Sequence, residues 1–227
     1  MEVQLLETFG SDLTVVNAAR VSFAKESLTL DEKDEKLIKY LARNGHNSPF
    51  YHPQVRFRLK MPIFVAREWF RHTVGFARNE VSRRYVDSEP EMFLPAVDDM
   101  RERDSNKKQG SKDTAIAEAA AARDLIQDIN ERSKGTYTRL LEMGVAPELA
   151  RTVLPQGMYT EFIETASLYA YARLCQLRMD PHAQKEIRDY AGAISEAMSK
   201  AFPVSWVALT GPGAVQPTAV TTTVATV

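Results

Sequence analysis

The feature that most constrains the fold is a strict alternation of apolar and basic side chains over residues 54–60. Successive side chains of a β-strand point to opposite faces, so this alternation indicates a strand with one buried and one exposed face. The apolar positions are Val55, Phe57 and Leu59, and the basic positions are Arg56, Arg58 and Lys60. The sequence therefore predicts a half-buried strand here.

Patterns on both sides of this strand predict a chain that mixes strands and helices. Strands are predicted over residues 3–8 and from 158 to about 163, while residues 12–24 are compatible with either a helix or a strand. Thr29 and Glu32 have the spacing of a capping box, which predicts a helix that ends before Gly45. Further helices are predicted over residues 62–70, 113–143, 147–155 and from about 164 to 178, and from Asp180-Pro181 onward.

Two stretches lack the patterns of regular structure. Residues 86–112 contain two prolines, one glycine and many charges, and are interpreted as a surface excursion. From Thr210 the chain is low in charge and rich in small residues, which predicts a disordered tail over residues 210–227. Residues 1–209 are expected to form one domain.

Composition limits the class of protein. The chain has 227 residues, of which 44% are hydrophobic and 26% charged, enough for one compact domain. Its formal net charge of -1 provides no overall attraction to nucleic acid or membranes, so any anion site must be a local cluster. The single cysteine, Cys175, excludes a disulfide framework and fits a cytoplasmic location. Neither a signal peptide nor a membrane-spanning stretch is evident.

The densest basic cluster lies at residues 67–85, which read REWFRHTVGFARNEVSRRY. It contains five arginines and one histidine among two glutamates. Arginine binds phosphate through paired hydrogen bonds and keeps its charge when partly desolvated, so one interpretation is an anion-binding surface. The alternative is a solvated helix end whose charges pair locally.

The second half of this cluster has the form NExSxRY, and an Arg-His pair precedes it. The matching residues are Arg71, His72, Asn79, Glu80, Ser82, Arg84 and Tyr85. The arrangement resembles RHRxxSxNExSxRY, the signature of the flavin-dependent thymidylate synthases. Thr73 replaces the second arginine, the family serine has no counterpart in residues 74–77, and the spacing is one residue longer. Arg78 is a candidate to supply the missing guanidinium from a shifted position.

Other blocks resemble the same family in the same order. Residues 45–50 (GHNSPF) resemble its GHxSPFEH loop, with Tyr51 in place of the glutamate. Residues 150–155 (ARTVLP) resemble its AR-x-V/I-LP segment, and residues 177–187 resemble LRxxxHAQxEI. The resemblance covers residues 3–207, apart from an insert near 98–115.

The resemblance implies a fold, a reaction and an assembly. The family fold is α/β (α+β), a single domain with a central sheet and flanking helices, called the thymidylate synthase-complementing protein fold. The family methylates dUMP to dTMP with carbon from 5,10-methylenetetrahydrofolate and hydride from NADPH, passed through FAD, which stores two electrons between half-reactions. It is a homotetramer with active sites between subunits. No metal, nucleic acid or membrane is expected as a partner.

The resemblance also implies roles for individual residues in binding dUMP. Arg84 and Arg151 hold the phosphate and sugar end, and Arg151 comes from a neighbouring subunit. Arg178 is the catalytic candidate, because a fixed cation near the pyrimidine stabilises the negative charge that develops as N3 ionises. The alternative for Arg178 is a helix C-terminal cation. The further substrate-binding candidates are Glu68, Arg71, Glu80, Ser82 and the backbone at Arg83.

For FAD, the resemblance implies a second set of residues. The set comprises His46, Ser48, Arg71, His72, Thr73, Glu80, Arg173 and His182. Thr73 and Arg173 stand where the family places an arginine and an asparagine. Cys175 lies outside every matching block, which favours a buried structural thiol.

Two other functions are compatible with the sequence. One is a nucleic-acid-binding module that uses the basic face of residues 67–85, against which the near-zero net charge argues. The other is a relative that binds nucleotide and flavin without turnover.

Overall fold

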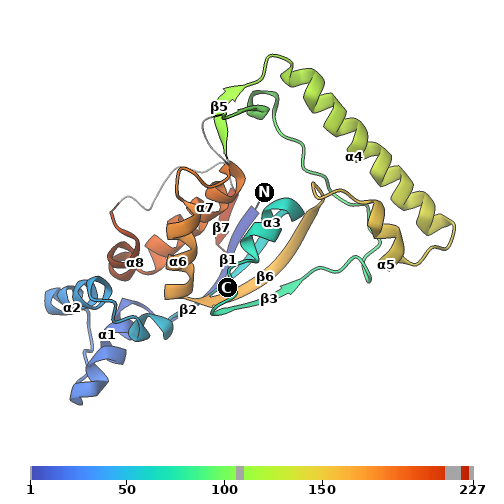
Figure 1. The fold of residues 1–227 in the computed structure, drawn as a ribbon. Coiled ribbons are helices and arrows are strands. Elements are labelled where there is room, and N and C mark those ends of the chain that lie inside the picture. The colour runs from blue at the N-terminus through green and yellow to red at the C-terminus, as the bar shows by residue number, and fades with distance from the viewer. Residues whose placement is uncertain (1, 106–109, 213–220, 225–227) are drawn as a thin grey trace. The chain divides into compact units, whose positions relative to one another are not determined.

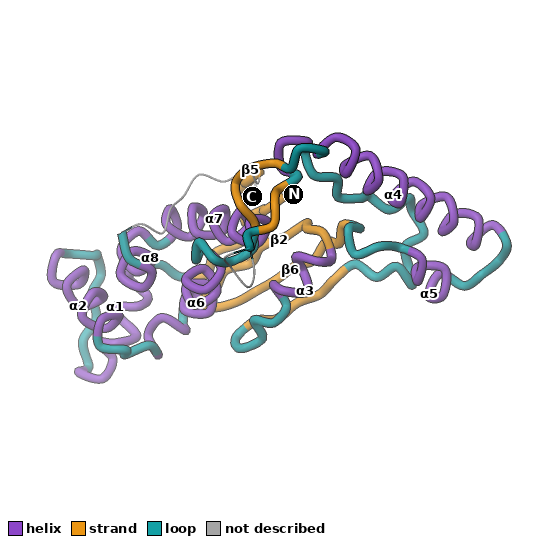
Figure 2. Tube along the Cα trace, turned by 45° about the horizontal axis from the view of Figure 1, so that its top comes forward, coloured by secondary structure: helices purple, strands orange, loops and turns teal. Residues whose placement is uncertain are grey.

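A computed structural model describes residues 2–105, 110–212 and 221–224. Helices and strands are interspersed along the chain (Figure 1 and Figure 2), which confirms the mixed α/β class. The chain divides into two compact units. The first unit comprises Met1–Leu59, Arg71–Asn79 and Ile163–Val227, and the second comprises Lys60–Phe70 and Glu80–Phe162. Within the described ranges, no helix has the length and apolar character needed to cross a membrane.

The main sheet has five strands in the order β3-β6-β2-β1-β7. Their bounds are β1 Glu2–Phe9, β2 Gln54–Pro62, β3 Phe76–Glu80, β6 Tyr159–Ser167 and β7 Thr221–Val224. In β2 the apolar side chains of the alternating stretch are buried and its arginines exposed, so the predicted half-buried strand is confirmed. The strands predicted over residues 3–8 and 158–163 are confirmed as β1 and the start of β6. The helix predicted from about residue 164 begins only at Leu168, because β6 continues to Ser167.

The first unit packs its last three helices against one another. They are α6 (Leu168–Arg178), α7 (Lys185–Ala201) and α8 (Pro203–Thr210). The aromatic side chains of Tyr190, Phe202 and Trp206 are fully buried, and the indole N–H of Trp206 donates to Ser195 Oγ at 2.8 Å. The stretch 12–24 is helical, as α1 (Asp12–Arg20) and the 3-10 turn η1 (Val21–Phe23).

Two helices of the first unit start at residues other than those predicted. The helix α2 (Glu32–Arg43) is capped by Asp31, whose carboxylate accepts from two backbone N–H groups, so Thr29 is not the cap. The helix α7 begins at Lys185, not at Asp180-Pro181. The physical reason is that the Asp180 carboxylate accepts the N–H of His182 at 2.8 Å and closes a local turn instead.

The second unit contains a short helix, a long helix and a small hairpin. Its helices are α3 (Ile63–Trp69), α4 (Ala119–Glu142) and α5 (Pro147–Ala150), with 3-10 turns η3 (Val97–Asp99) and η4 (Arg151–Val153). The strands β4 (Arg101–Arg103) and β5 (Ser111–Ala115) pair antiparallel. The helix predicted from residue 113 therefore starts later, because β5 takes up the backbone there.

The C-terminal tail contains one described strand. Residues Thr221–Val224 form β7 and pair in parallel with β1. The prediction of a disordered tail is corrected at these residues, since their Thr- and Val-rich sequence suits a strand beside an available edge. Residues 213–220 and 225–227 lie outside the described residues.

The start of α8 gives a prediction about stability. The buried carboxylate of Asp12 accepts the N–H groups of Val204 at 2.9 Å and Ser205 at 2.8 Å. Asp12→Ala should lower the free energy of unfolding by about 1–2 kcal/mol, since a helix cap is lost and its N–H groups lose their acceptor. Urea denaturation measures this, with exposed Asp87→Ala as control. A loss no larger than that of the control would contradict the capping role.

Candidate active site

Two of the predicted site residues in the first unit, an arginine and a histidine, form a hydrogen-bonded pair. Arg178 is in the last turn of α6, and its Nε donates to Nε2 of His72 at 2.8 Å. His72 lies in the irregular stretch between α3 and β3. These residues are 106 positions apart in sequence, so the fold brings them together.

His72 is a neutral imidazole at physiological pH. Burial, together with the positive charges of Arg178, Arg78 and Arg173, lowers its pKa to about 4. Because Nε2 accepts from Arg178, the ring proton belongs on Nδ1. The uncharged ring therefore has a lone pair on Nε2 that accepts the hydrogen bond from the Arg178 guanidinium.

The pKa of His72 gives a pH prediction. Its folded-state pKa of about 4 lies below the ordinary 6.5, so the unfolded chain binds more protons between these values. The contribution of His72 therefore lowers the free energy of unfolding as pH falls from 6.5 to about 4. The His72→Gln variant has no titrating group at this position, so it lacks this pH dependence. Melting temperatures of both proteins are measured in the same flavin-loading state. As the pH is lowered, the melting temperature of wild type should fall more than that of the variant, so the two values converge or cross. Parallel pH dependence would show that His72 is not buried as a neutral ring.

Arg78 packs behind this pair. Its Nε forms an ion pair with the fully buried Glu164 of β6, and its Nη1 donates to the carbonyl oxygen of His72 at 2.6 Å. Its guanidinium also lies 4.6 Å from the ring centre of Phe76. These contacts argue against Arg78 as a replacement for the missing signature arginine at a ligand, because its Nε and Nη1 donate to protein groups and its Nη2 is buried.

The other candidates of the first unit lie on its surface. Those that are exposed are His46, Ser48, Arg71, Thr73, Arg173 and His182. The ring of His46 lies 5.9 Å from that of Tyr40. The ring Nδ1 of His182 lies 2.9 Å from Asp180 Oδ1, so this histidine is bound to its own turn. The positive charge of Arg173 contributes to the lowered pKa of His72.

The candidates of the second unit are held by neighbours in the chain and by β6. The Glu80 carboxylate accepts from Thr160 Oγ1 at 2.5 Å, and the N–H of Val81 donates to the Glu161 carbonyl at 2.9 Å. Ser82 Oγ accepts the N–H of Arg84 at 3.3 Å. The NExSxRY segment is therefore anchored along β6 and turns at its serine.

The arginines of this segment have different surroundings. Arg83 donates to the carbonyl of Ser88, and the Arg84 guanidinium lies 5.1 Å from the ring centre of Tyr85. Arg151 is exposed in η4, and its Nε donates to the Glu148 carbonyl at 3.3 Å. Exposed guanidinium groups held by neutral partners keep their charge for an anion. The half-exposed Glu68 lies on α3.

Sequence reasoning missed the buried polar residues of β6. Thr160 and Glu164 lie on the buried face of this strand, where Phe162 and Ala166 also lie. A glutamate at an inward position of an alternating strand is rare unless it is paired. The predicted strand ended at about residue 163, which placed Glu164 in the following helix and hid this signal for a buried partner such as Arg78.

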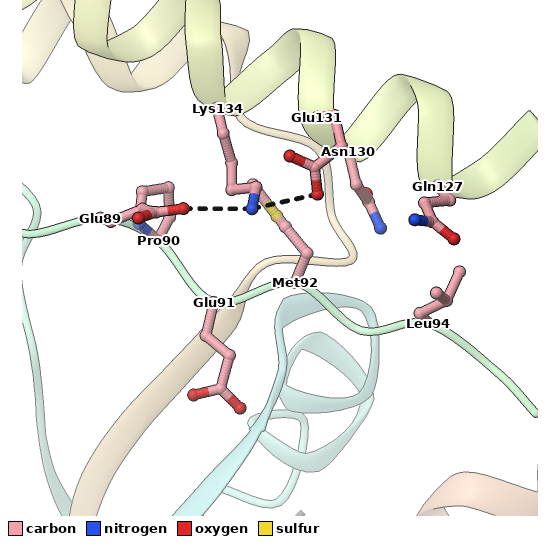
Figure 3. Close-up of a pocket in the computed structure, with 9 residues that line it drawn as sticks. All are labelled: Glu89, Pro90, Glu91, Met92, Leu94, Gln127, Asn130, Glu131 and Lys134. Atoms are coloured by element: carbon pink, nitrogen blue, oxygen red, sulfur yellow. Dashed lines mark hydrogen bonds and ion pairs between the residues drawn. The ribbon is translucent and has the colours of Figure 1, made fainter.

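The lining of a polar pocket in the second unit contains none of these candidates. It has a volume of about 430 Å³ and is lined by Glu89, Pro90, Glu91, Met92, Leu94, Gln127, Asn130, Glu131 and Lys134. In Figure 3, Lys134 points between two glutamates, with Nζ 3.1 Å from Glu89 Oε1 and 3.1 Å from Glu131 Oε1. Three of the pocket's charged residues are thus paired with one another, while Glu91 pairs with Lys60 at 2.6 Å. Within the described part of the chain, no cluster of His, Cys, Asp and Glu is placed to hold a metal ion.

Cys175 is a buried thiol in α6. It is fully buried, its Sγ lies 3.5 Å from the Ala191 carbonyl oxygen, and burial raises its pKa. A thiol in this state is a poor nucleophile. The predicted structural role is consistent with this packing.

Cys175→Ala is therefore expected to keep turnover within about twofold of wild type, at a small cost in stability from the cavity. Turnover of the purified, FAD-loaded variant and its melting temperature test this. A folded variant that has lost turnover would show that the chemistry depends on the thiol.

Together, the sheet with its helices and the three arginines whose charges act on a neutral histidine define an α/β protein with a local cationic cluster. A sequence model of the family described as Thymidylate synthase complementing protein matches residues 4–204. The chain belongs to this family.

Relatives and a solved structure agree with this assignment. The chain is 41% identical to a flavin-dependent thymidylate synthase of Thermus thermophilus, over 91% of this chain and 74% of the relative. It is also 41% identical to the synthase of Kosmotoga olearia, over 90% of this chain and 87% of the relative. The crystal structure of the UMP/dUMP methylase PolB from Streptomyces cacaoi, bound with 5-Br dUMP, superposes with a TM-score of 0.83. It is 32% identical and covers 95% of this chain and 97% of PolB.

Proposed function

We propose that the protein is an FAD-dependent thymidylate synthase that methylates dUMP to dTMP with 5,10-methylenetetrahydrofolate and NADPH. The observation that carries the proposal is the guanidinium of Arg178, held by a neutral His72 beside Arg173. The names of the relatives support the same reaction. Residues 1–209 form the synthase domain in this proposal.

FAD suits the donors of the first unit. The ligand has an anionic pyrophosphate, and the exposed Arg71, Arg173, Ser48 and Thr73 offer cationic and hydroxyl donors. Glu80, His46 and His182 complete the proposed set. When bound, FAD supplies the hydride for the reduction. The residues of this chain bind and orient it, and the neutral His72 adds no charge of its own.

The second ligand of the proposed function is dUMP. Arg84 and Arg151 are exposed guanidinium groups that suit the phosphate. The turn at Ser82 and the backbone at Arg83 support them, and Glu68 completes the set with Arg71 and Glu80 of the FAD group. Arg178 acts on the pyrimidine, where a fixed cation stabilises the anion that forms at N3.

The assembly in this proposal is a homotetramer in the cytoplasm. Support comes from apolar side chains of α4, where Leu125 is 68% and Ile129 57% exposed. These residues line an apolar groove of about 440 Å³ with Phe64 and Phe93. A second copy of the chain would remove this surface from water. Arg151 then reaches the site of a neighbouring subunit.

Two measurements test the function. The purified protein should release FAD on acid denaturation, and with FAD, 5,10-methylenetetrahydrofolate and NADPH it should release tritium from dUMP labelled at C5. PolB is named a methylase of both UMP and dUMP, and a parallel assay with UMP tests whether this chain also accepts both nucleotides. FAD binding without tritium release would favour the relative without turnover. A colourless protein that binds no FAD would exclude both flavoprotein functions.

A further inference from the structure

The guanidinium of Arg78 connects separate parts of the first unit. It pairs with Glu164 on β6, donates to the His72 carbonyl and lies against Phe76. The side chain of Arg78 is 14% exposed and that of Glu164 0%. A buried carboxylate requires a charged partner, so Glu164 fixes where the guanidinium lies.

The segment that Arg78 holds is an irregular one. His72 lies between α3 and β3, in a stretch that has neither helix nor strand structure. The 2.6 Å bond from Arg78 Nη1 to the His72 carbonyl ties this stretch to β3, and through Glu164 to β6. The rigid sheet thereby sets the position of the His72 backbone.

From these contacts we propose that Arg78, held by Glu164, is a positioning residue that fixes His72 so that its imidazole can orient Arg178. The proposal rests on the proposed function, because it assigns Arg178 to the pyrimidine. It gives a role to a residue that lies directly before the Asn79-Glu80 pair.

The ionisation state of His72 supports this chain of contacts. Burial and the charges of three arginines lower its pKa to about 4, so Nε2 keeps a lone pair for Arg178. The bond between them is 2.8 Å long. Arg78 thus contributes both a contact to the backbone and a charge near the ring, and the test must separate these contributions.

The test uses full-length enzyme with FAD in excess and two variants. Arg78→Lys keeps the charge, but an ammonium lacks the planar fork that bridges a carboxylate and a carbonyl. The double variant Arg78→Met/Glu164→Gln removes both charges, so no carboxylate is left buried alone. Both should lower single-turnover methylation of dUMP about 10- to 100-fold. The KM for dUMP should change less than about threefold, since the proposed phosphate ligands are other residues.

A second readout does not depend on activity. The nitrogen NMR shifts of the His72 ring, assigned with His72→Gln, show which nitrogen carries the proton. Wild type should have the proton on Nδ1 between about pH 5 and 8, and both variants should show a mixture of tautomers. If Arg78→Lys does not fold, the double variant carries the test.

The outcomes separate this proposal from the proposed function. An Arg78→Lys enzyme with wild-type rate and tautomer overturns the positioning role. A lower rate with an unchanged His72 tautomer also overturns it, because the effect would not pass through His72. A wild-type enzyme without turnover sinks the proposed function, while the tautomer comparison still decides whether Arg78 positions His72.

Discussion

Replacing Arg178 with alanine is expected to lower the rate of dUMP methylation about 10²- to 10³-fold while FAD stays bound. The reaction at C5 requires electron density from the nitrogen and carbonyl side of uracil, and a guanidinium there stabilises the resulting anion. Arginine stays charged across the neutral range, so this stabilisation does not depend on a proton. The measurement is single-turnover methylation by the reduced, FAD-loaded enzyme with saturating dUMP and folate.

Matched variants separate catalysis from a structural role of Arg178. Arg43 is also in the last turn of a helix, and Arg43→Ala controls for loss of a favourable charge at a helix C-terminus. Arg178→Lys should rescue poorly, because an ammonium lacks the planar donor set that faces His72. If Arg178→Ala methylates within about threefold of wild type, Arg178 is structural and the assignment is wrong.

The parts of the fold that the sequence could predict are those set by local patterns. The alternation of apolar and basic residues was sufficient to predict β2 and its buried face, because every second side chain of this strand enters the core. The end of α6 at Arg178 was likewise predicted, and the structure ends the helix there. Elements with several competing start signals were predicted less well. In α7 a carboxylate and a proline suggested a helix cap, yet they form a turn before the helix.

The contacts of the candidate site depend on long-range pairing, which no local pattern encodes. Arg78 and Glu164 are 86 positions apart, and their pairing follows from the adjacency of β3 and β6 in the sheet. The family resemblance supplied His72 and Arg178 as separate candidates with different ligands. It did not predict that one would hold the other, because that contact depends on where α6 ends relative to β3.

Arg151 gives the second large expected effect, which concerns the assembly. In the proposed tetramer each site takes Arg178 from one chain and Arg151 from another. Homotetramers of Arg151→Ala or of Arg178→Ala should both be nearly inactive, since every site lacks one guanidinium. Co-expression of the two variants with different affinity tags, and purification by both tags in turn, yields mixed tetramers.

These mixed tetramers should recover up to about a quarter of wild-type turnover, because about one site in four combines the two intact arginines. The exposure of Arg151 in η4 supports a role outside its own chain, since its guanidinium is accessible to a neighbour. The matched control combines Arg151→Ala with an Arg151→Ala/Arg178→Ala double variant, which contains no intact Arg151 and should stay inactive. If Arg151 served the site of its own chain, no mixed tetramer could contain a complete site. Doubly purified tetramers without recovered turnover would therefore contradict the shared site, while recovery in the experiment and not in its control would establish it.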